Sequence, residues 1–379
     1  MSNGIMKILL EDVIIYILLR FSVKSLLRFK FISKSWYSLI QSSRFKNIHI
    51  NDTTTTNNEF IIFSRSFKET EGFKNVLSIN CSDDHNDLVL IDLDLPYLNF
   101  TRRFNELVGP CNGLIVLTDN DVIVLFNPAT RNYMSLPLNP FVCQKGFHRS
   151  FKGDIGFGFD SIGNDYKFVR ISEVFLNAYW GPEKQEKKVE VYDLCIDSWR
   201  DVNPDMDQQL PSVFSNPSFE ILHHGTFHWY AKTDRIFVIL CFDISTEIFH
   251  NMNMPDACNV FDGKCYSLTV LNELLTLICY PPPKSNNDLT QHTMDIWIMM
   301  EYNVHQSWTK MYMIKPFPFE FPLTTWRDHL LLLQSKSGLL ISYDLNSNQV
   351  KEFDLHAYPK SLRVIVFKES LISIPKRGP

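Results

Sequence analysis

Residues 9–36 read LLEDVIIYILLRFSVKSLLRFKFISKSW, and this stretch decides the fold of the first part of the chain. It begins with two acids, Glu11 and Asp12, which favour the first turn of a helix. The apolar residues that recur at helical spacing after them are Val13, Ile14, Ile17, Leu18 and Phe21. Ser22 and Ser33 can cap two further short helices. Residues 1–50 therefore predict a small all-α bundle of three helices.

A bundle of about fifty residues is small for a stable core of its own, so we expect something else to cover part of its apolar surface. The same residues resemble an F-box, in the segments LLEDV (9–13), VKSLLRFK (23–30) and SKSW (33–36). In that family the motif docks a Skp-type adaptor, which bridges to a cullin and a RING subunit. The adaptor contacts that the resemblance implies are Leu9, Val13, Ile17, Leu18, Val23, Leu26, Leu27 and Trp36. It thus implies the substrate receptor of an SCF-type E3 ubiquitin ligase.

The chain departs from the F-box pattern at three positions. Leu10 and Ser22 stand where the family usually has proline, and Phe31 stands where it commonly has a small cysteine. Proline at a first helical position pre-sets the backbone, so its loss predicts a lower affinity for the adaptor. A plain helical hairpin packed on the rest of the chain remains the structural alternative.

The composition of the 379 residues bounds the class of protein. With 45% hydrophobic and 13% aromatic residues, the chain can form two or three domains with a large core. Its net charge of -5 argues against a nucleic-acid partner. Neither a signal peptide nor a membrane span is evident, so we expect a soluble, cytoplasmic protein. The eight cysteines lack metal-ligand spacing and predict small apolar residues in strands; we expect no metal and no cofactor.

The composition changes at Asn51, where the polar run NDTTTTNN (51–58) predicts a linker. From 59 to 379, short β-type runs are broken by Gly, Pro, Asn and Asp. One motif recurs there, an apolar strand, a polar turn and a second short strand, and its copies lie 43 to 66 residues apart. The residues that mark its turns are Asn127, Asp193, Asp243, Glu301 and Asp344. The spacing predicts a large all-β domain that is β-propeller-like, and we describe it as kelch-like.

Residues 100–350 resemble a plant F-box-associated domain, in segments such as NPATR (127–131) and DYKFVR (165–170). The segments that carry a narrower resemblance, to the S-locus F-box proteins of pollen, include ISEV (171–174), MNMPD (252–256) and SYDLNS (342–347). That resemblance implies recognition and ubiquitination of non-self S-RNases in the cytosol of the pollen tube, a step in self-incompatibility.

Histidines and glycines offer two possible sites, and each has a structural alternative that we favour. His223, His224 and His228 suggest a metal cluster, but on a strand only His224 and His228 would share a face. Three glycines are spaced loosely like a phosphate loop, although no Lys-Ser/Thr follows, and we favour a bend between strands. They are Gly153, Gly156 and Gly158.

Three acids raise the alternative of a propeller enzyme. Asp160, Asp193 and Asp243 suggest the paired carboxylates of a glycosidase, but each lies in its own turn signal. We therefore favour local roles in turns and expect a non-catalytic receptor, which acts by bringing substrate lysines close to a charged conjugating enzyme. A second alternative is an F-box paralogue or scaffold that binds an unrelated protein.

Two segments predict contacts with a protein substrate. Residues 81–95 contain five aspartates and no lysine or arginine, and an acidic patch at Asp83, Asp84 and Asp87 could attract a basic ribonuclease. The polar insertion 177–188 contains Tyr179 and Trp180, which could anchor a partner. A solvated loop and a covered propeller edge are the structural alternatives.

Overall fold

The first part of the chain forms a helical domain (residues 11–51). The computed structural model describes residues 11–51, 59–69, 72–80, 88–93, 106–119, 122–140, 147–150, 155–176, 185–202, 210–213, 220–258, 263–282, 293–358 and 360–375. A helix at residues 11–18 precedes α2 (Val23–Phe29), α3 (Lys34–Gln41) and α4 (Ser43–Asn51). Ser22 and Ser33 cap α2 and α3, because their hydroxyls accept the backbone N–H groups of Ser25 and Trp36. The helix α4 was not predicted.

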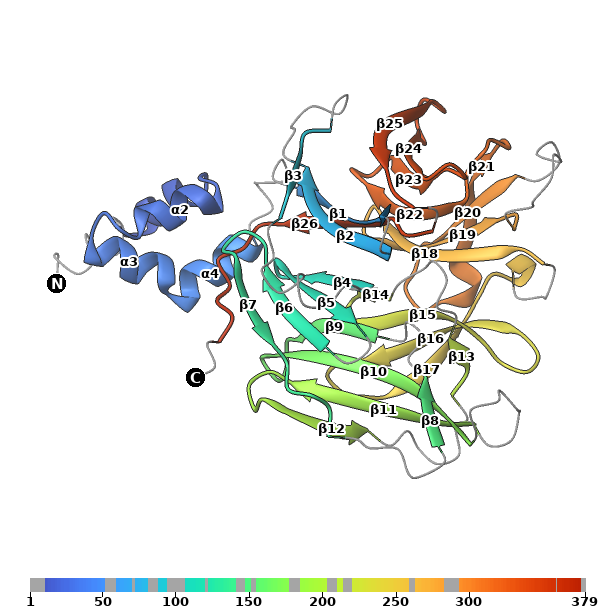
Figure 1. Ribbon diagram of the computed structural model, residues 1–379, viewed down its shortest axis with the longest axis horizontal. Helices are drawn as coiled ribbons and strands as arrows, with labels where there is room; N and C mark the ends of the chain where they lie inside the picture. Colours follow the sequence, from blue (N-terminus) through green and yellow to red (C-terminus); the bar gives the residue numbers. More distant parts are fainter. Residues whose placement is uncertain are drawn as a thin grey trace.

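The remaining chain forms six antiparallel sheets in the described residues, arranged as the blades of a propeller (Figure 1). Blade 1 contains β4 (Glu106–Cys111), β5 (Leu114–Asp119), β6 (Val122–Asn127) and β7 (Asn132–Ser135). Blade 2 contains β9 (Ile155–Asp160), β10 (Asp165–Leu176), β11 (Gln185–Asp193) and β12 (Ser198–Val202), with β8 (Phe147–Ser150) beside β10. Blade 3 contains β14 (Ile221–His223), β15 (Thr226–Lys232), β16 (Phe237–Asp243) and β17 (Phe249–Asn253), with β13 (Ser212–Val213) beside β15.

The other blades follow the same order. Blade 4 contains β18 (Cys265–Leu271), β19 (Leu274–Tyr280), β20 (Met294–Met299) and β21 (Trp308–Ile314). Blade 5 contains β22 (Phe321–Trp326), β23 (Leu330–Gln334), β24 (Leu339–Asp344) and β25 (Val350–His356). Blade 6 contains β26 (Arg363–Lys368), β1 (Glu59–Glu69), β2 (Gly72–Asn80) and β3 (Leu90–Asp92). Short 3-10 turns are η2 (Asp256–Cys258) and η3 (His305–Ser307).

Blade 6 closes the ring, because it combines strands from both ends of the chain. The last strand β26 pairs with β1, from Glu59 opposite Lys368 to Ser64 opposite Arg363. The first strands of neighbouring blades lie next to one another around the axis, and β26 takes its place between β22 and β4. The β-propeller expected from the sequence is confirmed. Its topology is shared by the kelch type and by other propellers.

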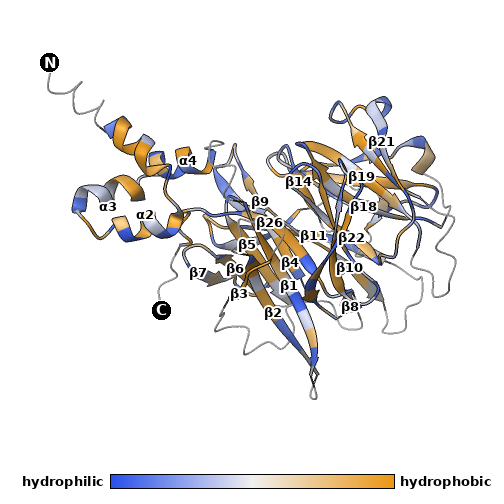
Figure 2. Ribbon diagram, turned by 90° about the horizontal axis from the view of Figure 1, so that it is seen from above, coloured by the Kyte–Doolittle hydropathy of each residue, from blue (hydrophilic) through white to orange (hydrophobic). Residues whose placement is uncertain are grey.

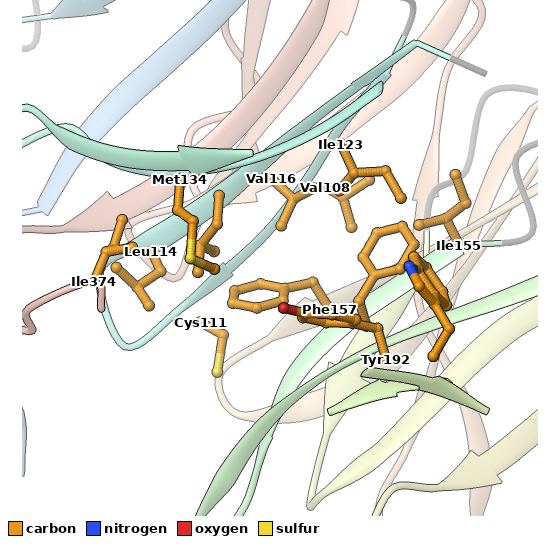
Figure 3. Close-up of a cluster of buried hydrophobic side chains, with 13 residues drawn as sticks. Val108, Cys111, Leu114, Val116, Ile123, Met134, Ile155, Phe157, Tyr192 and Ile374 are labelled. Carbon is orange, nitrogen blue, oxygen red and sulfur yellow. The ribbon is translucent and has the colours of Figure 1, made fainter. Parts of the chain in front are cut away.

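Apolar side chains between neighbouring blades form the core. In Figure 3 the side chains of blade 1, such as Val108 and Val116, point toward Phe157 and Tyr192 of blade 2. Similar clusters join blade 2 to blade 3 and each later pair of blades around the ring. Each blade is therefore stabilised by its two neighbours as well as by its own hydrogen bonds.

The glycines of blade 2 differ from the bend expected from the sequence. Gly156 and Gly158 lie within the strand β9, and Gly153 lies outside the described residues. A Cβ atom on Gly156 would lie 3.0 Å from the ring of Phe227 in blade 3. The glycines thus allow two blades to approach closely at the axis, which is a recognised use of glycine in a strand.

The turns between the third and fourth strands repeat one hydrogen-bond pattern. Asn127, Asp243 and Asp344 each use Oδ1 to accept the backbone N–H groups two and three residues ahead. This confirms the turn role expected for the marker residues of blades 1, 3 and 5. The sequence repeat did not identify blade 6 because its strands are divided between the two ends of the chain.

We expect Gly156→Val to lower the free energy of unfolding by about 2 kcal/mol, because the added methyl groups overpack against Phe227. Phe227→Leu should cost a similar amount alone but add little in the double variant, since the smaller side chain makes room. Urea unfolding of the two single variants and the double variant measures this coupling. Additive losses would contradict the proposed contact.

Candidate functional site

The outer face of the helix at residues 11–18 is apolar and exposed, and Arg20 contacts it at Tyr16, where its guanidinium donates to the hydroxyl and lies over the ring. Val13, Tyr16 and Ile17 are 54%, 60% and 48% exposed, and they share one face at helical spacing. Ile15 and Leu18 on the opposite face are buried in the core of the helical domain. Figure 2 shows this domain projecting from one side of the propeller, so the outer face is open to another molecule.

The structure divides the expected adaptor contacts into two groups. Val13 and Ile17 are exposed, whereas Leu18, Val23 and Leu26 are almost fully buried. Leu27 and Trp36 are partly buried against the same core, and Leu9 and Leu10 lie outside the described residues. The buried residues can shape the adaptor surface, but in this conformation they cannot form it.

Five exposed apolar side chains of the helical domain were not among the expected adaptor contacts: Tyr16, Phe21, Phe31, Ile32 and Tyr37. Phe31 and Ile32 follow the end of α2, and the side chain of Phe31 is 91% exposed. The helical spacing of the apolar residues from Val23 to Ile32 predicted that Ile32 belongs to the second helix, but α2 ends at Phe29.

The helical domain is also basic. Residues 1–50 contain eight lysines and arginines but two acids. Both acids are near Arg44, whose guanidinium lies 2.8 Å from the carboxylate of Asp12 and 3.9 Å from that of Glu11. Burial lowers the pKa of Lys30, and the nearby charge of Lys46 lowers it further. An acidic partner would complement this surface.

A cavity of about 330 Å³ lies on the axis of the propeller and is lined by the first strand of every blade. Glu220 lines it, and its carboxylate accepts the backbone N–H of Gly109 at 3.2 Å. Burial raises the pKa of Glu220 well above its usual value, and burial also raises the pKa of Glu106. Burial lowers the pKa of Arg363 to about 10. Of these three groups only Glu220 lines the cavity, and burial leaves its carboxyl group poorly solvated there.

Two of the three acids considered for a glycosidase lie in ion pairs within blade 2, and the cations of these pairs also bind Glu247 of blade 3. The ammonium of Lys167 lies 2.8 Å from Asp160 and 2.9 Å from Glu247. Arg200 pairs with Asp193 at 2.6 Å and also with Glu247. Burial raises the pKa of Asp160, but hydrogen bonds from Lys167, Ser245 and Gly163 outweigh it and hold this pKa well below its usual value. These carboxylates have structural partners.

The third acid, Asp243, accepts hydrogen bonds within its own turn. The ring of His228 is buried and bonded to the carbonyl of Ile221 and the hydroxyl of Tyr302. Burial lowers the pKa of His223 and His228 to about 4. The expectation that His224 shares a strand face with His228 was wrong, because His224 lies in a turn with a φ of 49°. No group of three potential metal ligands occurs in the part of the chain that the structure describes.

The expected substrate contacts lie outside the described residues: Asp83, Asp84, Asp87, Tyr179 and Trp180. Of the acidic stretch, Asp92 is described, and its carboxylate accepts a hydrogen bond from Ser78 at 2.6 Å and lies 3.3 Å from Arg65. None of the described helices is long and apolar enough to span a membrane.

Comparison with known proteins gives two family matches and full-length relatives. Residues 8–48 match the F-box domain, and residues 90–374 match the F-box associated beta propeller domain. F-box protein At3g07870 of Arabidopsis thaliana is 26% identical, over 97% of this chain and 93% of its own length. F-box protein CPR1 of Arabidopsis thaliana is 28% identical, over 95% and 88%. A solved structure of TolB from Acinetobacter baumannii superposes with a TM-score of 0.46 at 11% identity, over 80% of this chain and 65% of that one.

We expect Lys167→Met to lower the free energy of unfolding by about 3 kcal/mol at neutral pH, because it leaves the buried carboxylate of Asp160 without its cation, whereas Glu247 keeps Arg200. The pKa values of Asp160 and Glu247 are lower in the folded state than in the unfolded chain, so their ionised forms stabilise the fold. This stabilisation is present above the unfolded pKa of about 4 and is lost as the pH falls through the folded pKa. The difference from wild type should therefore shrink in acid.

Urea unfolding at neutral pH and near pH 3 tests this expectation. Lys310→Met is the matched control, because Lys310 also pairs with an acid, Asp295 at 2.8 Å, but is much more exposed than Lys167. Its loss should stay below about 1 kcal/mol. Equal losses in the two variants would show that the buried ion pair of Lys167 stabilises the fold no more than the exposed ion pair of Lys310.

Proposed function

Because the chain belongs to the family of F-box proteins with an F-box associated β-propeller domain, we propose that it is the substrate receptor of an SCF-type ubiquitin ligase. In this proposal the F-box at residues 1–50 binds a Skp-type adaptor that leads to the cullin and RING subunits. The polar segment 51–58, whose first residue Asn51 ends α4, is the linker, and the propeller domain, 59–379, holds a protein substrate. The observation that carries the proposal is the exposed apolar face of Val13, Tyr16 and Ile17 on a domain fixed beside a propeller.

The helical surface offers an adaptor both apolar side chains and charge. Exposed aromatic and aliphatic side chains supply the apolar anchors that dominate protein interfaces. The excess of lysine and arginine around them favours a partner with an acidic face and speeds association. Ser22 stands where the family usually has proline, and its side chain caps α2. A hydrogen-bonded cap therefore defines the start of this helix in place of proline.

The proposed receptor needs no nucleophile of its own. Ubiquitin transfer would be accelerated by holding substrate lysines near the charged conjugating enzyme, which raises their effective concentration. The ion pairs of Asp160 and Asp193 and the turn role of Asp243 support this view over a propeller glycosidase. The second candidate is an F-box scaffold for a protein that is not degraded.

For the substrate, we propose a basic ribonuclease of the S-RNase class, with action in the pollen-tube cytosol. The support is the resemblance of segments such as 171–174 and 342–347 to S-locus F-box proteins, together with the acidic residues of 81–95. A different protein substrate of a paralogous receptor is the alternative.

We expect the double substitution Val13→Asp and Ile17→Asp to weaken binding of a Skp-type adaptor by at least about tenfold, because it places two charges in the centre of an apolar interface. The affinity of the wild type should also fall as salt increases. Calorimetry with the purified full chain and adaptor measures both effects.

Ile162→Asp is the matched control, since Ile162 is 82% exposed and lies in a turn of blade 2. It should leave adaptor affinity unchanged. If wild type and both variants bound the adaptor equally, the surface assigned to it would be wrong. If wild type bound no adaptor at all, the ubiquitin-ligase proposal would fail.

We expect charge reversal of the acidic segment, Asp83→Lys with Asp84→Lys and Asp87→Lys, to slow association with an S-RNase and to reduce its salt dependence. The double variant Tyr179→Ala and Trp180→Ala should instead raise the dissociation rate, because anchors act after encounter. Surface plasmon resonance with a panel of S-RNases separates the two rates. A panel that never binds the wild type would remove S-RNases as the substrate class.

A further inference from the structure

The C-terminal segment 369–375 leaves β26 and runs between the helical domain and blade 1. In Figure 1 this segment, coloured red, passes beside α4 on its way to the C-terminus. It forms no strand or helix. Its side chains alternate in their contacts, as expected for an extended chain in which successive residues point in opposite directions.

The residues of one set contact the helical domain. Leu371 is 1% exposed and is packed in the same apolar cluster as Leu18, Leu26 and Phe45. Burial raises the pKa of Glu369, and the backbone N–H of Val23 at the start of α2 and the charge of Lys24 offset part of this rise. The hydroxyl of Ser373 accepts a hydrogen bond from Lys46 of α4 at 3.0 Å. The helical domain thus obtains one of its core side chains from the far end of the chain.

The other set contacts the propeller. Ile372 and Ile374 pack against the cluster between blades 1 and 2. A Cβ atom on Gly113, in the first turn of blade 1, would lie 2.5 Å from the side chain of Ser370. That turn can approach the segment so closely because Gly113 has no side chain and adopts a φ of 74°.

Asn127 of blade 1 connects this segment to the turn pattern of the propeller. Its Oδ1 accepts the N–H groups of Ala129 and Thr130, as Asp243 and Asp344 do in their blades. Its amide nitrogen donates to the carbonyls of Ser370 at 3.2 Å and Ile372 at 2.9 Å. An ionised aspartate at this turn could accept the two backbone N–H groups but could not donate to the two carbonyls. This difference explains why blade 1 has asparagine at the position where blades 3 and 5 have aspartate.

We propose that residues 369–375 are a clamp that fixes the orientation of the helical domain on the propeller, and that Asn127 is the positioning residue that holds the clamp. The effect on ubiquitin transfer rests on the proposed function, whereas the clamp itself does not. A rigid orientation sets which substrate lysines reach the conjugating enzyme and how often they do so.

The first test measures the orientation directly. Fluorophores are introduced with unnatural amino acids at Lys34 and Ile162, both exposed, and single-molecule energy transfer reports their distance distribution. The wild type should give one narrow distribution. Asn127→Asp should broaden it, because a carboxylate keeps the turn acceptor but faces two carbonyl oxygens. A chain that ends after Ser370 should broaden it further.

The matched control is Asp243→Asn, which makes the reverse exchange in the equivalent turn of blade 3. It should behave as the wild type, and thermal unfolding should show that Asn127→Asp leaves the propeller folded. Unchanged distributions in both Asn127→Asp and the truncated chain would overturn the clamp. Equal broadening in Asp243→Asn would overturn the specific role of Asn127.

The second test uses the assembled ligase with adaptor, cullin, RING subunit and a bound substrate. Asn127→Asp should keep adaptor and substrate affinities, slow ubiquitin transfer by roughly threefold to tenfold and widen the set of modified lysines. Unchanged transfer with a broadened distribution would remove the positioning role. A wild type that bound no adaptor would overturn the proposed function and leave the distance result standing.

Discussion

The pairing of β26 with β1 is the constraint on which the rest of the structure depends. Each blade packs through apolar clusters against a neighbouring blade on both sides. The pairing of β26 with β1 completes blade 6, which is the neighbour of both blade 5 and blade 1. The pairing also removes two strand edges that would otherwise be exposed. Because β1 begins where β26 ends, the helical domain and the C-terminal segment leave the propeller at the same place. Their contact follows from the closure.

Local signals in the sequence predicted the parts of the fold that depend on neighbouring residues. Serine caps defined the starts of α2 and α3, and turn residues defined the hairpins of blades 1 to 5. Blade 6 was not recognised as a repeat because its pairing joins residues about three hundred positions apart. The inward face of the first helix was also ambiguous, since Val13, Ile17 and Leu18 are all apolar and periodicity alone cannot rank two apolar faces.

The candidate sites show the same division. Of the expected adaptor contacts, Val13 and Ile17 are exposed, whereas Leu18, Val23 and Leu26 belong to the core. The ion pairs between Lys167 and Glu247, and the hydrogen bonds of Asn127, join elements far apart in sequence, so no spacing rule could reveal them. The sequence contained one indication of the Asn127 contact, because asparagine, rather than an acid, marks the turn of blade 1. Its meaning required the position of the C-terminal segment.

The place of Leu371 has a consequence for the order in which the chain is made. The helical domain precedes the propeller in the chain, yet one of its buried side chains, Leu371, follows β26, the strand that closes the ring. Burial of a leucine contributes about 2 kcal/mol, a large share of the stability of so small a domain. A chain interrupted before residue 363 has neither a closed propeller nor a complete helical core. Completion of the first domain is therefore coupled to completion of the last, and a nascent or truncated product lacks both.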